Sequence, residues 1–107
     1  MLAERAEPLR KLGAAGWHTW LSLEPLLGPV DIEPYLQPAG IRGVVAGCES
    51  GVHRRPAPHD WFRRIRDDCL RAGVSFFLKQ MAENEDGTGK VLKLPELDGV
   101  RHDALAW

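Results

Sequence analysis

Three short apolar runs divide this chain, and each begins directly after a glycine. Residues 17–24 (WHTWLSLE), 41–46 (IRGVVA) and 74–79 (VSFFLK) are rich in aromatic and β-favouring residues, so they predict strands. The third run is apolar almost throughout, which is typical of a strand covered on both faces of its sheet.

Helical spacing of apolar residues separates the strands. Over residues 58–72 the apolar side chains share one helical face: Trp61, Phe62, Ile65, Cys69 and Ala72. Pro58 suits the first turn of this helix, and Gly73 suits its C-terminal cap. Shorter helices are predicted to begin near Pro8 and, with an N-cap, at Asp31.

The resulting order, β–α–β–α–β, predicts a small α/β domain with a three-stranded parallel sheet, because short helices between buried strands favour right-handed crossovers. Residues 5–81 form this predicted core. Residues 82–93 are polar and glycine-rich and predict a loop or weak hairpin, and residues 94–107 predict an irregular tail with a turn at Leu97-Asp98-Gly99.

Composition narrows the class of protein without naming a partner. The 107 residues suffice for one domain, and the formal net charge of −1 gives no global attraction to nucleic acid or anionic membranes. No apolar stretch approaches the ~20 residues of a membrane span, and the first residues lack the apolar core of a secretory signal. Cys48 and Cys69 have no CxxC spacing, so free thiols and a cytoplasmic location are expected.

Charged residues follow each predicted strand at its carboxyl end. Glu24 ends the first strand, Glu49 lies in the Gly47–Gly51 turn after the second, and Lys79 ends the third. In a parallel sheet these ends share one edge, where ligands bind in α/β proteins. Gly47 and Gly51 allow close backbone approach or positive φ. Two carboxylates and one ammonium facing a common space could bind a polar ligand or transfer protons.

An arginine-rich segment supports an alternative function. Five arginines form a possible nucleic-acid-binding patch: Arg54, Arg55, Arg63, Arg64 and Arg66. A solvated helix face is the favoured interpretation, because Asp60, Asp67 and Asp68 alternate with these arginines.

A thiol-dependent enzyme using Cys48 is the third hypothesis, although a buried and inert thiol is favoured over a nucleophile. The surrounding GCESG segment is not a nucleophile elbow, because Ser50 stands one position late. The segment 87–90 (GTGK) lacks the first glycine and the Ser/Thr of a phosphate loop. The histidines show no metal-ligand spacing, so no metal site is predicted.

Three segments together resemble the C-terminal half of a phage and bacterial protein family of unknown function, whose members are similar to radical-SAM proteins. They are LSLEPLLG (21–28), VVAGCESG (44–51) and FFLKQ (76–80), and LDG (97–99) follows in the same order. The resemblance implies a (βα) barrel-like fold of which this chain forms the last units. It marks these positions as ligand-binding: Glu24, Glu49, Ser50, Lys79 and Gln80. Cys48 departs from the glycine usual at its position.

The resemblance also implies S-adenosylmethionine as a cofactor of the complete protein. The N-terminal cysteine cluster of the family has no counterpart here, and two cysteines cannot supply the ligands of a four-iron cluster. No cofactor is therefore expected in this chain, and no independent catalysis. Three strands are also too few to close a barrel, which takes about eight. Two alternatives follow: the chain folds alone as a fragment with a small open sheet, or self-association or pairing with a complementing N-terminal half covers the open edges.

Overall fold

The computed structural model describes residues 20–36 and 41–103. Strands β1 (Trp20–Leu23), β2 (Gly43–Gly47) and β3 (Ser75–Ala82) alternate with helices α2 (Glu33–Leu36) and α3 (His59–Ala72). Three short strands follow, namely β4 (Val91–Lys93), β5 (Glu96–Leu97) and β6 (Val100–Arg101). The helix predicted near Pro8 lies outside the described residues.

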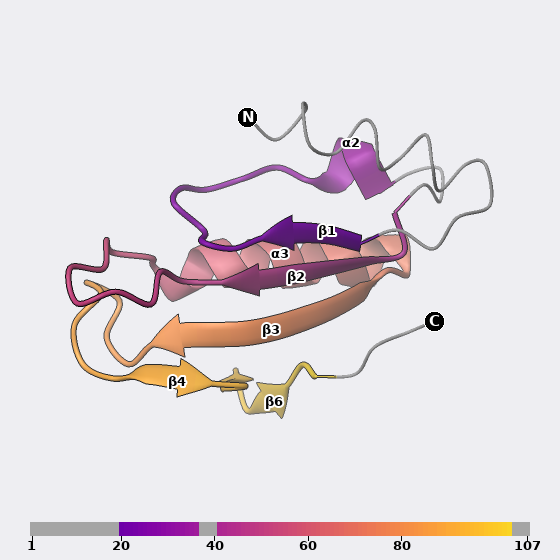
Figure 1. Ribbon diagram of the computed structural model, residues 1–107. Coiled ribbons are helices and arrows are strands. Elements are labelled where there is room, and N and C mark those ends of the chain that lie inside the picture. Colours follow the sequence, from indigo (N-terminus) through magenta and orange to yellow (C-terminus); the bar gives the residue numbers. More distant parts are fainter. Residues whose placement is uncertain (1–19, 37–40, 104–107) are drawn as a thin grey trace.

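The sheet is mixed and mostly parallel, in the order β1-β2-β3-β4 (Figure 1). Strands β1, β2 and β3 are parallel neighbours, as predicted, and β4 adds an antiparallel fourth strand on the outer edge of β3. Strands β5 and β6 form a separate hairpin. The sheet does not close into a barrel. None of the helices described here is long and apolar enough to span a membrane.

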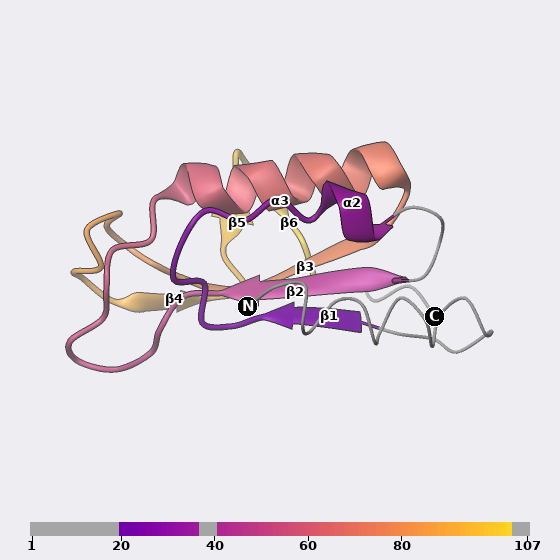
Figure 2. The ribbon, with the colours of Figure 1, turned by 90° about the horizontal axis from the view of Figure 1, so that it is seen from above.

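Helix α3 has the caps that the sequence predicts. Pro58 precedes it, and Gly73 ends it in the left-handed conformation with φ 69°. The amide of Val74 donates to the carbonyl of Cys69 at 2.9 Å, which completes the C-terminal cap. The buried face of α3, with Phe62 and Ile65, packs on one face of the sheet (Figure 2).

Helices α2 and α3 both lie on this one face, and coverage of the second face of β3 stays a prediction. Phe76 and Leu78 point into the core, whereas Phe77 is only half-buried on the other face. Trp20 lies on this face against Gly43, where an added Cβ would meet the indole ring at 2.5 Å.

The outer edge of β3 is occupied by the segments that follow it. Strand β4 pairs with Gln80 to Ala82, and the amide of Leu94 donates to the carbonyl of Lys79 at 2.9 Å. Closer to its start, Leu78 donates its amide to the carbonyl of His102 at 2.8 Å. The region predicted as a loop and irregular tail thus satisfies backbone groups that would otherwise form an open edge.

The predicted turn at Leu97-Asp98-Gly99 is the tip of the β5–β6 hairpin, and it anchors the hairpin to α3. Asp98 and Gly99 have φ of 52° and 81°, as a two-residue hairpin turn requires. Leu97 is 2% exposed. The Asp98 carboxylate accepts from Arg63 Nε at 3.1 Å and from Arg66 Nη1 at 2.6 Å. These arginines hold the pKa of Asp98 below its usual range.

We predict that Asp98→Asn lowers the melting temperature near neutral pH but has little effect in acid. The folded-state pKa of Asp98 lies below the unfolded value of about 3.9, so its stabilisation is present above that pH and is lost as pH falls through the folded pKa. Thermal melts across this range measure the effect. Asp103→Asn, at an exposed residue, is the control, and an equal loss at every pH contradicts the ion-pair explanation.

Candidate functional site

A cavity of about 280 Å³ opens at the carboxyl ends of the parallel strands. Its lining comes from the ends of β1, β2 and β3: Glu24, Pro25, Cys48, Glu49, Ser50, Gly51 and Gln80. The structure therefore brings together four of the five predicted ligand-binding residues in one cavity. The fifth, Lys79, does not line the cavity but forms an ion pair with Glu24, which does.

Glu24 and Lys79 form an ion pair across the face of the sheet opposite α2 and α3. Lys79 Nζ lies 2.9 Å from Glu24 Oε1, although β2 runs between their strands. Gly47 of β2 makes this possible, because a Cβ there would lie 2.8 Å from Glu24 Oε2. Position 47 requires glycine for this close approach and not for a positive φ. Glu24 Oε2 is buried and has no hydrogen-bond partner in the described part of the chain.

A β-bulge in β3 presents two consecutive side chains on the same face. Ala46 pairs with Leu78, but Gly47 pairs with Gln80, so Lys79 is the extra residue. Neighbouring side chains of a regular strand point to opposite faces. Here Lys79 contacts Glu24, and the Gln80 Cγ would lie 3.2 Å from a Cβ at Gly47, on the same face. Bulges of this kind redirect side chains beside active sites.

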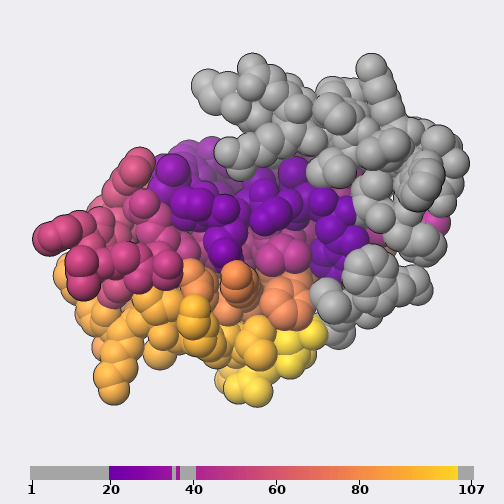
Figure 3. All heavy atoms as spheres, in the orientation of Figure 1, coloured from indigo at the N-terminus to yellow at the C-terminus, as the bar shows by residue number. Residues whose placement is uncertain are grey.

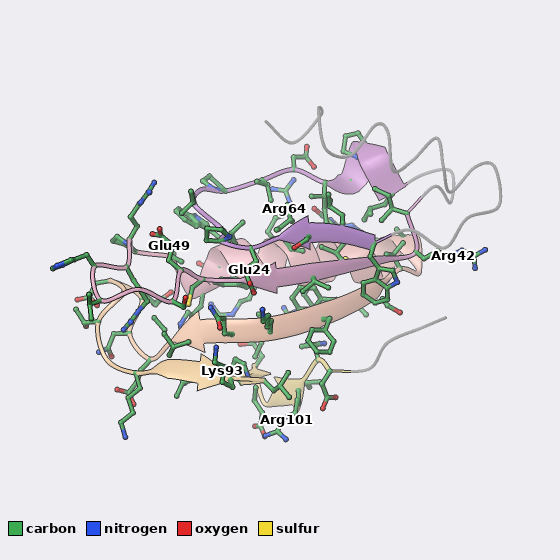
Figure 4. The ribbon with its side chains drawn as sticks, viewed as in Figure 1. Glu24, Arg42, Glu49, Arg64, Lys93 and Arg101 are labelled. Carbon is green, nitrogen blue, oxygen red and sulfur yellow. The ribbon has the colours of Figure 1, made fainter. Side chains whose placement is uncertain are left out.

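Gln80 links the bulge to the turn after β2 and to β4. This side chain is 3% exposed, and its Nε2 donates to the carbonyl of Cys48 at 2.8 Å. Its Oε1 accepts a hydrogen bond from Lys93 Nζ. Lys93 thereby joins the site from β4, a strand that the sequence predicted only as a loop or weak hairpin. Figure 4 shows Glu24, Glu49 and Lys93 around the same end of the sheet.

Glu49 is held in place by Arg55, which lies in the same loop between β2 and α3. Its Oε1 accepts from the amide of Arg55 at 3.0 Å, and Arg55 Nε lies 3.3 Å from the same oxygen. The Glu49 side chain is 25% exposed, so this carboxylate remains in contact with the cavity.

Arg54 clamps the loop after β2 onto the loop between β3 and β4, which lie side by side in Figure 3. Its Nη1 donates to the Gly51 carbonyl at 2.9 Å, its Nε to the Gly87 carbonyl at 3.1 Å, and its Nη2 to the Gly89 carbonyl. Gly87 and Gly89 both have positive φ. The GTGK segment is therefore accounted for as a structural loop.

The five arginines of the nucleic-acid hypothesis are engaged within the chain. Arg54 and Arg55 hold loops, as described above. On α3, Arg63 and Arg66 bind Asp98, and Arg64 lies 3.5 Å from Asp31 and 3.4 Å from Asp68. Carboxylates on α3 and from elsewhere in the chain thus neutralise much of the patch, so the arrangement gives no support to nucleic-acid binding.

Neither cysteine has the environment of a nucleophile. Cys48 is 2% exposed, and burial raises its pKa despite opposing effects of Arg54 and Lys93. Burial raises the pKa of the Cys69 thiol, which lies on the core-facing side of α3, to about 12. Both thiols are free. The described residues contain no cluster of His, Cys, Asp and Glu that could hold a metal ion.

We predict that Gly47→Ala destabilises the fold by about 1–3 kcal/mol, the usual cost of overpacking, because its Cβ would overlap the Glu24 carboxylate. Urea denaturation measures this loss. Gly51→Ala, four residues on in the same turn, is the matched control, since nothing lies within 4 Å of its added Cβ. Equal stability of the two variants would show that Gly47 is not required for close approach.

We further predict that Cys48 and Cys69 react slowly with iodoacetamide at neutral pH in the folded chain. Both thiols are buried with raised pKa values, so little thiolate is present. Mass spectrometry of the alkylated chain measures the rates, and the chain unfolded in guanidinium chloride, where both sites become accessible, is the reference. Rapid labelling of folded Cys48 would restore the thiol-enzyme hypothesis.

Comparison with known proteins gives one family match. The model of a family described as "Protein of unknown function (DUF5131)" matches residues 1–106. No curated protein and no solved structure matches the chain.

Proposed function

This chain belongs to DUF5131, a family of proteins of unknown function, and we propose that it forms a polar ligand pocket at the carboxyl ends of its parallel strands. In this proposal it is the C-terminal part of a radical-SAM-like enzyme and is not catalytic alone. Its ligand-binding residues are Glu24, Glu49, Ser50, Lys79 and Gln80.

The bulge in β3 carries this proposal. It places Lys79 and Gln80 together beside a cavity whose wall also includes Glu24. Stability does not explain the arrangement well, because a half-exposed ion pair such as Glu24–Lys79 contributes only about 0–1 kcal/mol. Glu24 Oε2 is buried with no donor among the described residues, which works against stability, since such a group costs about 1–3 kcal/mol. Ligand binding accounts for both features.

The difference between the two faces of the sheet supports the proposal that this chain is part of a larger barrel. Helices α2 and α3 lie on one face, as on the outside of a (βα) barrel (Figure 2). The other face carries Val45, Phe77 and the cavity residues, as an inner face would. Because β4 is antiparallel to β3, the further parallel strands that a barrel requires, from a complementing segment or a second copy, would join beyond β1.

S-adenosylmethionine is the cofactor that the family resemblance suggests for the complete enzyme. Glu24 Oε2 has no donor within residues 20–36 and 41–103, and the hydroxyl and ammonium groups of this cofactor can donate hydrogen bonds to a carboxylate. When bound, the cofactor would supply the radical chemistry. Glu24 would bind and orient it, and any iron–sulfur cluster would require ligands beyond the described residues.

We predict that small polar compounds, S-adenosylmethionine among them, shift amide signals of the cavity in ¹⁵N-labelled full-length chain. The shifts should cluster at Glu49, Ser50 and the Gln80 side-chain amide, because these line the cavity. Glu24→Gln should weaken binding about tenfold, in line with the loss of a charged hydrogen bond. Glu96→Gln, at an exposed residue of β5, should not. Shifts that cluster elsewhere, or no shifts in a folded spectrum, would contradict the pocket.

A further inference from the structure

The charges around the strand-end cavity do not cancel. Glu24 is paired with Lys79, and Glu49 is paired with Arg55, so these four residues form two neutral pairs. Arg54 and Lys93 do not line the cavity but bind residues that do, and in the described part of the chain both donate to neutral carbonyl or amide oxygens and to no carboxylate. Of these six charged residues, Arg54 and Lys93 therefore contribute two positive charges that no carboxylate among the described residues balances.

Both unpaired cations act on residues that line the cavity. Arg54 Nη1 donates to the carbonyl of Gly51, and Lys93 Nζ donates to Gln80 Oε1. Their electrostatic effect reaches the cavity wall, because the charges of Arg54 and Lys93 both favour the thiolate of Cys48. The excess of positive charge thus belongs to the cavity and not only to the outer surface.

The two cations differ in what they can offer a ligand. Arg54 already donates from all three of its nitrogens, so it contributes charge but little hydrogen bonding. An ammonium has three donors, and Lys93 uses one of them on Gln80. Lys93 is exposed on β4, so its other donors can bind a ligand beside Gln80, which lines the cavity.

We propose that the cavity binds its ligand through an anionic group, a carboxylate or a phosphate, and that Lys93 is the residue that binds it. This rests on the proposed function, since it assigns a chemical class to the ligand of the same pocket. An exposed lysine usually serves only solubility, but here the ammonium is positioned by Gln80, a 3% exposed amide fixed at its other end by the Cys48 carbonyl. A ligand that carries only positive charge would be repelled by Lys93.

Titration of the ¹⁵N-labelled full-length chain with three probes at constant ionic strength tests the ligand class. Sodium phosphate and sodium acetate should give saturating shifts at Gly51, Gln80 and the Lys93 amide, and ethylammonium chloride should not. The stronger of the two anions identifies phosphate or carboxylate as the preferred group. Lys93→Met should weaken anion binding at least tenfold, and Lys93→Arg should retain most of it.

Lys90→Met is the matched control, because Lys90 is an exposed lysine three residues away on the same hairpin. Equal losses of anion binding in Lys93→Met and Lys90→Met would show that the effect comes from general surface charge, and would overturn the role of Lys93. Ethylammonium shifting the cavity signals in place of the anions would overturn the ligand class while leaving the pocket intact. No response of the cavity to any probe would count against both the pocket and its anionic ligand.

Discussion

The strand-end site depends on the absence of a side chain at Gly47. This residue sits in the middle parallel strand, between the strands that carry Glu24 and Lys79. Any Cβ there would fill the space in which the Glu24 carboxylate lies, at 2.8 Å from Oε2. The side chain that follows β1 and the one on β3 can meet across β2 only because β2 carries a glycine between them. The bulge then adds Gln80 to the same face, directly opposite Gly47. Backbone geometry, more than side-chain attraction, determines which polar groups are neighbours.

Much of this architecture can be predicted from the sequence, because it depends on local features of the chain. The caps of α3 at Pro58 and Gly73, the three parallel strands and the charged groups at their ends follow from residue type and spacing. The bulge does not, since a one-residue shift in pairing depends on the partner strand and leaves no pattern within β3 itself. Lys93 was missed for a related reason: β4 is three residues long and is ordered by its pairing with β3.

The arginines illustrate why charge along a sequence is a weak guide to partners. Arg63 and Arg66 are separated by more than 30 residues from Asp98, yet all three meet when the β5–β6 hairpin packs on α3. A segment that looks basic in sequence is thus largely neutralised by carboxylates from elsewhere in the chain. The excess positive charge that survives lies at the cavity, on Arg54 and on Lys93. Lys93 lies outside the arginine-rich segment altogether.

The occupied outer edge of β3 has a consequence for assembly. Strand β4 and the backbone at His102 take up hydrogen-bonding groups along that side of the sheet. The edge on that side now belongs to β4, which is only three residues long, and very short edge strands are one way in which natural sheets hinder pairing with other chains. A long strand of eight residues is thus shielded by a short one, which lowers the tendency of that side of the sheet to template aggregation.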